Sequence, residues 1–562
     1  MLIKTQQPES IYFEFSNNKM KPGTKSILKW IGIILSAIIL IAIAFGLYVK
    51  SILPKFDSKP IALQKELFRK PAQPFPMEGK FIYKSASELA AMIRAKRASS
   101  VDIVTEFLNN IKNNNYKYNA LIFIRDQEAL EDARKADEEL AVGDTINKPL
   151  LGVPVTIKEM FWVKGSPSTW NAKLYGFTAP RNAEVVKQIK NAGAIILGTT
   201  NQPFMLADYQ TKGEVYPTAN NPFDTTRTPG GSTGGGAAAL AAGFTTLELG
   251  SDLGGSIRQP AVFCGLWSLK PTYGTVNVTD GTSPDSAYVY TRLAMESAGP
   301  LARTPDDLKL MWEVIRNTKI DPRFQKPIEW KPSTEKSLAQ YKIAWSDEWK
   351  LKENVVKVSD DTKQKLNAFI DSLKHHKVVV EKNAPDIYSD LQKMFLSTFG
   401  SMMGENQPWL MRKFIEMEYA KADDGSGNYE PFTTAIMDAS DDGWNRIQAE
   451  REILITKWEN FFKQYDFFIC PVTYDAAFKK CESWKPIKAD DGTMVEYMDY
   501  VAYAYVINAT GHPTITVPLG LNKQGLPMGL QIVGRYYSEP ELLHLSKLLE
   551  PLTPKFQKPG ER

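Results

Sequence analysis

Cysteine and histidine are scarce in this chain of 562 residues, which contains three cysteines and four histidines. A small and odd number of cysteines argues against a framework of disulfides. No group of cysteine, histidine and aspartate residues has the spacing of zinc ligands, and no histidine lies near the glycine-rich stretch between residues 227 and 273. We therefore expect no metal, no other cofactor and no catalytic triad based on histidine.

An excess of one charge is also missing. The 68 lysines and arginines nearly balance the 64 aspartates and glutamates, which leaves a net charge of +4. No basic stripe with interleaved aromatic residues is present, so we expect no nucleic-acid partner. The hydrophobic content of 43% and the charged content of 23% are typical of globular proteins, and the length allows one large domain or several.

One long apolar run lies near the N-terminus. Residues 1–30 are polar, whereas residues 31–49 contain no charged side chain. A helix of this length, rising about 1.5 Å per residue, just crosses a hydrocarbon core of about 30 Å. Trp30 and Tyr48 stand near its ends, as interfacial anchors do. We predict an uncleaved membrane anchor, with a cleaved signal peptide and a buried core helix as the alternatives.

The segments around this run suggest an orientation. Four lysines lie between residues 19 and 29 and three between residues 50 and 59. The positive-inside rule favours, by a narrow margin, a cytoplasmic N-terminus and a catalytic domain outside the cytoplasm. Residues 50–80 contain five prolines and are typical of an extended linker. We therefore predict a single-pass membrane protein whose domain occupies residues 81–557.

Helix and strand patterns alternate within residues 81–557. A capping box at Ser85–Glu88 precedes a helical pattern, residues 152–158 and 194–198 have the pattern of short buried strands, and residues 184–192 are helical in pattern. This alternation predicts one large α/β domain with a mixed, twisted sheet flanked by helices. Residues 275–450 are less patterned, and we expect them to form a variable region on the substrate side.

Glycine is concentrated between residues 227 and 273. A first loop, residues 230–236, contains Ser232, and a second turn, residues 251–256, ends at Ser256. Each of these two serines follows a Gly-Gly pair, and such glycines let backbone N–H groups approach a ligand closely. A phosphate-binding loop is disfavoured, because no Gly-Lys-Ser/Thr follows and no GxGxxG opens a helix.

A nucleophilic serine needs a base. With no histidine nearby, the candidate is Lys158, at the end of a predicted strand. This lysine has to be neutral to accept a proton, and burial behind Val155 and Ile157 would lower its pKa. Taken singly, Lys158 could be an ordinary strand-end lysine, Ser232 a turn residue and Ser256 a helix N-cap.

A wider set of motifs in the same order resembles the amidase signature family. The resemblance extends from about residue 81 to residue 557 and implies the α/β fold of that family and hydrolysis of a carboxylic amide through a serine acyl-enzyme. The motifs that carry it are GVPVTIK at residues 152–158, GTTN at 198–201, PGGSTGGG at 229–236, SDLGGSIRQPA at 251–261, TGHP at 510–513 and GLPMGLQ at 525–531.

The resemblance implies a role for each matched position. Lys158 would be the base, Ser232 the bridging serine after a cis peptide bond, and Ser256 the nucleophile. The oxyanion hole would be formed by the backbone N–H groups of Leu253, Gly254, Gly255 and Ser256.

Neighbouring positions would support this triad. Asp252 and Arg258 match charged family positions, although a surface ion pair is the alternative for Arg258. Thr233 replaces a serine and Glu159 replaces an aspartate that many members carry, and both replacements keep the type of functional group.

The substrate is predicted less directly. Met205 and Leu206 fall where the fatty acid amide hydrolase branch of the family lines its acyl pocket, and together with the predicted anchor they favour a hydrophobic or lipid amide. The alternatives are an anchored amidase that acts on soluble amides or oligomers, an amidotransferase-type subunit, and a binding module without activity. The expected partners are a small-molecule amide, the membrane and a second copy of the chain in a homodimer.

Overall fold

The computed structural model of the chain describes residues 63–560 with short gaps. The gaps are residues 144, 174–175, 283–294, 317–327, 329, 331, 351–354 and 421–428. The chain divides into two compact units, Met1–Asp57 and Ser58–Arg562, and every described residue belongs to the second. The predicted polar segment, the predicted anchor at 31–49 and the linker up to residue 62 lie outside the described residues.

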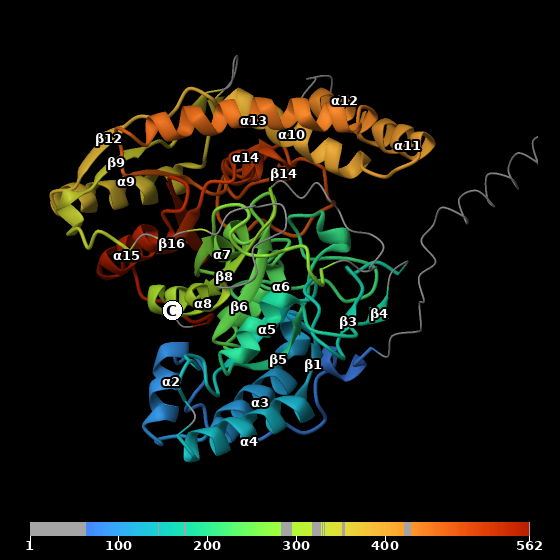
Figure 1. The fold of residues 1–562 in the computed structure, drawn as a ribbon, viewed down its shortest axis with the longest axis vertical. Helices are drawn as coiled ribbons and strands as arrows, with labels where there is room; N and C mark the ends of the chain where they lie inside the picture. Colours follow the sequence, from blue (N-terminus) through green and yellow to red (C-terminus); the bar gives the residue numbers. More distant parts are fainter. Residues whose placement is uncertain are drawn as a thin grey trace, which may run out of the picture. The chain divides into compact units, whose positions relative to one another are not determined.

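An eleven-stranded sheet runs through the described unit (Figure 1). In spatial order its strands are β1 (Leu121–Ile124), β5 (Ile195–Thr200), β2 (Pro154–Lys158), β6 (Leu247–Asp252), β8 (Ser297–Ala302), β7 (Trp267–Lys270), β16 (Thr514–Leu521), β17 (Pro527–Gly534), β13 (Phe467–Pro471), β9 (Lys342–Trp345) and β12 (Val379–Lys382). Strands β5, β2 and β6 are mutually parallel, as are β13, β9 and β12, whereas the remaining pairs are antiparallel. The predicted mixed sheet is therefore present.

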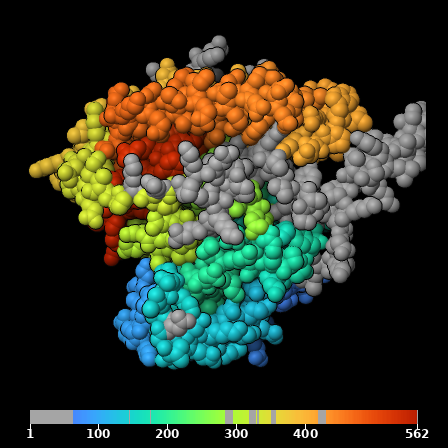
Figure 2. Space-filling model, in the orientation of Figure 1, coloured from blue at the N-terminus to red at the C-terminus, as the bar shows by residue number. Residues whose placement is uncertain are grey.

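Helices cover the sheet and extend beyond it. They are α2 (Ala86–Arg94), α3 (Ser100–Tyr118), α4 (Asp126–Ala141), α5 (Glu184–Asn191), α6 (Gly234–Ala241), α7 (Arg258–Phe263), α8 (Pro305–Ile315), α9 (Asp360–His375), α10 (Tyr388–Gly404), α11 (Trp409–Ala420), α12 (Glu430–Met437), α13 (Asp441–Phe461), α14 (Ala502–Thr510) and α15 (Glu539–Leu549). Helices α10 to α13 gather on one side of the unit, where the orange segment is exposed in the space-filling view (Figures 1 and 2).

Local sequence explains where several helices begin and end. The side chain of Ser85 accepts a hydrogen bond from the N–H of Glu88 at 3.0 Å, and the Glu88 carboxylate accepts one from the N–H of Ser85 at 2.8 Å. This capping box satisfies two of the N–H groups that a helix start leaves without partners. Helix α3 ends at Asn119, which adopts a left-handed conformation with φ of 50°.

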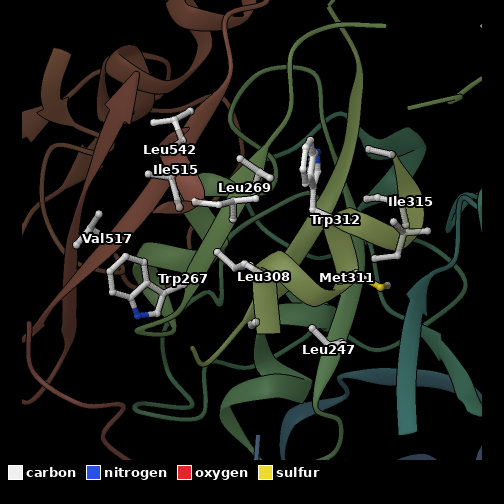
Figure 3. Packing of buried hydrophobic residues seen from close by; sticks show 14 of the residues in the cluster. Leu247, Trp267, Leu269, Leu308, Met311, Trp312, Ile315, Ile515, Val517 and Leu542 are labelled. Atoms are coloured by element: carbon white, nitrogen blue, oxygen red, sulfur yellow. The ribbon is translucent and has the colours of Figure 1, made fainter. Parts of the chain in front are cut away.

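The core lies between the sheet and the helices on its faces. Figure 3 shows side chains of α8, including Leu308 and Trp312, packed beside Trp267 and Leu269 of β7. All are nearly inaccessible to solvent. Burial of each such side chain contributes about 1.5–3 kcal/mol to the free energy of folding. This packing holds the central strands in place.

The described part of the predicted linker contacts the domain. Leu67 is buried in the same cluster as residues of α3, and the side chain of Gln64 bonds to both the N–H and the carbonyl of Ile124, at 2.8 and 3.0 Å. The segment 64–68 therefore packs against the edge strand β1. The domain boundaries inferred from the sequence stay predictions.

The fold class predicted from the sequence included an N-terminal transmembrane helix, and this part of the prediction is corrected. Among the described residues, no helix is both long and apolar enough to cross a membrane. The longest helices there, α3 and α13, have 19 and 21 residues but carry charged side chains along their length, which a bilayer interior disfavours. The described residues therefore form the α/β domain with no membrane-spanning helix among them, and the predicted single-pass membrane location with an extracytoplasmic catalytic domain finds no support there. The run at 31–49 lies outside the described residues.

Candidate active site

Lys158 is the last residue of β2 and lies between β5 and β6 in the parallel part of the sheet. Its side chain is completely buried. The Nζ atom donates a hydrogen bond to Oγ of Ser232 at 2.6 Å and another to Oγ of Ser251 at 2.9 Å. The predicted base thus contacts the first glycine loop, together with a second serine that the sequence analysis missed. The available signal for Ser251 was its place beside Asp252 at the start of the second glycine turn.

Ser232 stands in the loop that leads into α6. The peptide bond between Gly231 and Ser232 is cis, as the resemblance implied. A Cβ atom at Gly231 would lie 2.3 Å from the carbonyl oxygen of Asp208, so only glycine fits at this position. The loop is therefore packed directly against the segment around Asp208, and Ser232 is 2% exposed.

Ser256 lies at the end of the second glycine turn, between β6 and α7, and is 8% exposed. The N–H of Thr233 donates a hydrogen bond to the carbonyl of Ser256 at 3.1 Å. The hydroxyl of Thr233 donates to the carbonyl of Ser251 at 3.2 Å. Thr233 therefore joins the two glycine loops, which is the supporting position expected for it.

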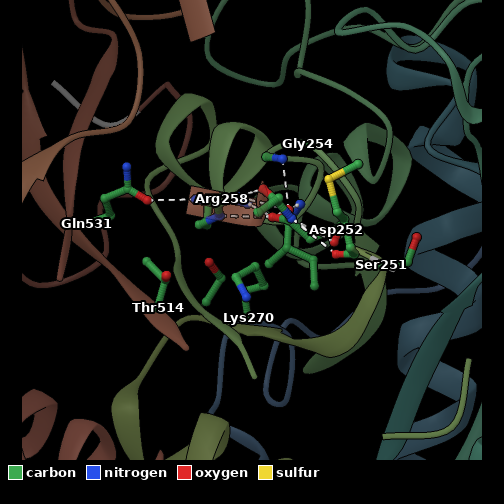
Figure 4. Close-up of polar contacts among 12 residues, drawn as sticks. Ser251, Asp252, Gly254, Arg258, Lys270, Thr514 and Gln531 are labelled. Carbon is green, nitrogen blue, oxygen red and sulfur yellow. Dashed lines mark hydrogen bonds and ion pairs between the residues drawn. The ribbon is translucent and has the colours of Figure 1, made fainter. Parts of the chain in front are cut away.

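Asp252 and Arg258 form a fully buried ion pair (Figure 4). Arg258 donates to both oxygens of the Asp252 carboxylate at 3.0 Å and to Oε1 of Gln531 at 2.8 Å. Asn508 adds a bond to the same carboxylate at 2.9 Å. Burial works against ionisation, but the Arg258 guanidinium holds the pKa of Asp252 well below its usual range. The pair is internal, so the surface alternative for Arg258 does not describe it.

The second glycine turn offers backbone donors near Ser256. Leu253 and Gly254 line the same cavity as the two serines. The N–H of Gly255, however, donates to Oδ1 of Asp252 at 2.8 Å, and Gly255 has a φ of 107°, which favours glycine. Of the donors predicted for an oxyanion hole, Gly255 is thus engaged in holding the turn.

Burial changes the acidity of Lys158. Removal of the ammonium from water lowers the pKa of Lys158 to about 8, although the nearby charges of Glu296, Asp252 and Glu248 oppose this shift. At pH 7 about a tenth of the Lys158 side chains are then neutral, compared with less than about one part in a thousand for a free lysine. A neutral lysine at this place can accept a proton from a serine hydroxyl.

Two further carboxyl groups are buried near Lys158. Burial raises the pKa of Glu159 and of Glu248 to about 7 in each case. Glu159 accepts bonds from the N–H and hydroxyl of Thr169 at 2.5 and 2.7 Å, and Glu248 accepts bonds from the hydroxyls of Thr156 and Thr200 at 2.5 and 2.6 Å. Glu248 was not predicted, because an isolated glutamate within an apolar strand pattern does not indicate which neighbours it will meet.

A cavity of about 180 Å³ opens above the two serines. By the volume that one water needs, it has space for roughly a dozen waters or for a sizeable organic group. Met205 and Leu206 are among the residues that line it, and the backbone φ values of both are positive, at 51° and 63°. Trp170 also lines it, and its indole N–H donates to the carbonyl of Thr282 at 3.1 Å.

The opposite wall of the cavity comes from within residues 275–450, the region expected on the substrate side, but its individual residues were not predicted. It is formed by α10 and α12, which supply Phe395, Leu396, Phe399, Met402, Met403 and Phe432. The rings of Phe395 and Phe399 are stacked 6.1 Å apart, and those of Phe399 and Phe432 lie 5.6 Å apart. The spacing of Phe395, Phe399 and Met402 was a helical signal, but nothing local showed which face would meet the serines.

The contacts around Lys158 and the two glycine loops define a class of protein. Among the residues that the structure describes, no group of three or more histidine, cysteine, aspartate or glutamate residues could hold a metal ion. Ser232, which is bonded to a buried lysine, shares one mostly apolar cavity with a second serine and a turn of backbone donors. This is an α/β enzyme equipped for acyl transfer through a serine.

Comparison with known sequences gives the family. A family model described as Amidase matches residues 102–543. The chain is 30% identical over 503 residues to the glutamyl-tRNA(Gln) amidotransferase A-subunit 2 of Clostridium acetobutylicum, an alignment that covers 83% of this chain and 98% of that protein. It is 31% identical over 487 residues to a glutamyl-tRNA(Gln) amidotransferase A-subunit of Clostridium botulinum, with 83% and 97% covered. The chain belongs to the amidase family, and it is an enzyme that acts on the carbon–nitrogen bond of amides.

Solved structures share the fold. A bacterial aryl acylamidase is similar with a TM-score of 0.69 and 21% identity, over 84% of this chain and 97% of that one. A fatty acid amide hydrolase is similar with a TM-score of 0.68 and 20% identity, over 91% and 94% of the two chains. The resemblance to the amidase signature family is therefore confirmed, while identities this low concern the fold alone.

Proposed function

We propose that the protein hydrolyses a carboxylic amide through an acyl-enzyme on Ser256, with Ser232 as the bridging serine and Lys158 as the base. The observation that supports this most strongly is the 2.6 Å contact between the buried Nζ of Lys158 and Oγ of Ser232, in a cavity that Ser232 shares with Ser256. The lowered pKa of Lys158 supports the same role, because it supplies a neutral base near physiological pH.

The proton moves along this chain of groups. Neutral Lys158 accepts the proton of Ser232, which in turn accepts the proton of Ser256 as its Oγ attacks the amide carbonyl carbon. When the carbon–nitrogen bond breaks, the proton returns through Ser232 to the leaving amine, and the acyl group stays on Ser256 as an ester. Water then takes the place of the amine, and its attack on the ester releases the carboxylic acid and restores Ser256.

Backbone N–H groups stabilise the charge on the carbonyl oxygen in this proposal. Leu253, Gly254 and Ser256 supply the donors, while Gly255 keeps its bond to Asp252. Loss of one such donor typically costs about 3–4 kcal/mol of transition-state stabilisation. The buried Asp252–Arg258 pair keeps the turn in shape, because Asp252 also accepts the N–H of Ile257 at 3.0 Å.

The substrate carries an apolar group in this proposal, and Met205 and Leu206 lie against its acyl part. The support is the apolar lining from α10, α12 and the segment 205–206, which a hydrated polar chain would not match. The substrate is a small molecule, since the cavity of about 180 Å³ admits one group of that size. A homodimer stays a prediction.

An amidotransferase-type subunit is the second candidate, and the observation in its favour is the 30% identity to a named amidotransferase protein. The two candidates differ in what the isolated chain does. If the protein is a hydrolase, the isolated chain should cleave apolar anilides by itself. An amidotransferase-type subunit should depend on partners for its activity. Equal rates on long-chain and short-chain acyl anilides would remove the preference for apolar substrates.

A fluorophosphonate probe tests the proposal directly. We expect the wild-type protein to be labelled, and both Ser256→Ala and Lys158→Ala to lose labelling. Ser268→Ala is the matched control, because Ser268 is also buried but bonds to Thr516 within the sheet. Absence of labelling in the wild type, or labelling that survives in Ser256→Ala, would overturn the proposal.

A further inference from the structure

Two carboxylates, Asp208 and Glu296, stand in the wall of an otherwise mostly apolar cavity. No lysine or arginine among the described residues lines that cavity. Glu296 directly precedes β8, and its negative charge raises the pKa of Lys158. The proposed hydrolysis uses no group at the position of Asp208, so the presence of a carboxylate there calls for a separate explanation.

Asp208 is held in place by three donors, two from the distant segment 483–497 and one from its own turn. Its oxygens accept bonds from the hydroxyls of Tyr497 and Ser483 and from the N–H of Gln210, the last at 3.1 Å. The carboxylate therefore has a fixed position. The charge of Lys212 lowers the pKa of Asp208, but its Nζ donates a hydrogen bond to the carbonyl of Cys481 at 2.9 Å and not to the carboxylate. Burial raises the pKa of Asp208 despite these partners, so the protein itself leaves the negative charge only partly compensated.

Aromatic side chains are grouped beside Asp208. The rings of Tyr209 and Tyr497 lie 6.2 Å apart, and those of Trp484 and Tyr497 lie 5.3 Å apart. Tyr209 and Trp484 line the cavity together with Asp208. The faces of such rings attract cations, which adds to the attraction of the carboxylate.

This group lies beside the catalytic loops. The hydroxyl of Tyr209 donates to the carbonyl of Gly254 at 3.1 Å, and the backbone of Asp208 packs against Gly231, which precedes Ser232. Asp208 is also two residues beyond Leu206, in the wall that the proposed function gives to the acyl group. A substituent bound at Asp208 would therefore belong to the acyl part of the substrate.

We propose that Asp208, with the rings of Tyr209 and Trp484, forms a subsite for a cationic group on the acyl part of the amide substrate. The inference rests on the proposed function and narrows its substrate class to apolar acyl chains that carry a protonated amine. The same charges disfavour an anionic acyl group, because a carboxylate would enter a cavity that already contains two of its own sign.

Three p-nitroanilides of matched length test the subsite by hydrolysis, with ω-aminopentanoyl as the cation, hexanoyl as the neutral isostere and glutaryl as the anion. We expect kcat/KM to fall in that order. The cationic substrate should exceed the neutral one by about tenfold or more, the effect of a hydrogen bond to a charged group, and the anionic substrate should be slower still because its charge is repelled by Asp208 and Glu296. The difference should lie mainly in KM, because the charge is remote from the bond that breaks.

Two variants separate charge from structure. Asp208→Asn removes the charge and should lower the ratio of the cationic to the neutral rate by about tenfold. Tyr497→Phe removes one donor to the same carboxylate, yet leaves the charge, and should keep that ratio within a few-fold. A ratio that Asp208→Asn leaves unchanged, or a wild type that prefers the hexanoyl substrate, would overturn the subsite.

A binding measurement keeps this test independent of turnover. Calorimetry with the Ser256→Ala protein should show hexylammonium binding at least about tenfold more tightly than hexanol, and Asp208→Asn should abolish that preference. Equal binding of the two ligands would overturn the subsite even if all three anilides are cleaved. Absence of anilide cleavage with selective binding of hexylammonium would overturn the proposed hydrolysis and support the subsite.

Discussion

The Nζ atom of Lys158 lies 2.6 Å from Oγ of Ser232, although 74 residues separate them in the chain. The same nitrogen lies 2.9 Å from Oγ of Ser251. The two hydroxyl acceptors fix the orientation of the Lys158 side chain. Because the bond to Ser251 holds Nζ in place, the bond to Ser232 is the route for the proton. This arrangement and the cavity above it lead to four predictions.

The first prediction concerns pH. Burial lowers the pKa of Lys158 to about 8, and the neutral form is the base, so kcat/KM should rise about tenfold per pH unit below that value and level off above it. A pH–rate profile from pH 6 to about pH 10 measures this.

Glu248→Gln is the matched variant for this profile. The charge of Glu248 raises the pKa of Lys158, and glutamine can keep the bonds to Thr156 and Thr200. The midpoint should therefore move to lower pH. A flat wild-type profile would contradict the role of Lys158, and a midpoint that moves upward would contradict the sign of this interaction.

The second prediction separates the two serines bonded to Lys158. Ser251→Ala removes one acceptor from a buried charged group, which should lower kcat/KM by about 10- to 100-fold. Ser232→Ala interrupts the proton route itself and should cost about a hundred- to ten-thousandfold. Steady-state kinetics on one neutral anilide compares them, and a larger loss for Ser251→Ala would reverse the roles of the two serines.

The third prediction concerns the buried ion pair. Arg258→Met leaves the Asp252 carboxylate without its countercharge in a fully buried place, and this should lower the free energy of unfolding by about 3–5 kcal/mol. Urea denaturation measures the change.

The control for this variant is Arg181→Met. Arg181 pairs with Asp280 at the surface, and its side chain is 45% exposed. Its loss should lower the free energy of unfolding by about 1 kcal/mol or less, because solvent screens exposed pairs. Similar losses for both variants would show that burial does not determine the strength of the Asp252–Arg258 pair.

The fourth prediction concerns the wall from α10. Phe399→Ala removes a ring that lines the cavity between Phe395 and Phe432, and it should raise KM for a long acyl anilide about tenfold more than for an acetyl anilide. Phe461→Ala is the matched control, because Phe461 is also partly buried in the same cluster but does not line the cavity. The same change in selectivity in both variants would point to a general loss of packing.

Much of the fold could be predicted because its signals are local. The capping box at Ser85–Glu88 and the glycine turns around Ser232 and Ser256 depend on residues within a few positions of each other. Short buried strands were recognised for the same reason, and β2 ends at Lys158 as expected. The membrane helix that was added to the fold class has no counterpart among the described residues. Hydropathy reports only that a run is apolar and long enough.

The sequence by itself determined which chemical groups are available: a strand-end lysine, two serines that each follow a Gly-Gly pair, and a turn rich in backbone donors. Only the tertiary structure decided that Lys158 also meets Ser251 and that α10 and Asp208 complete the cavity. The physical reason is that these contacts join segments up to hundreds of residues apart. Strand order and helix packing create them, and a local pattern does not encode which distant face a side chain will meet.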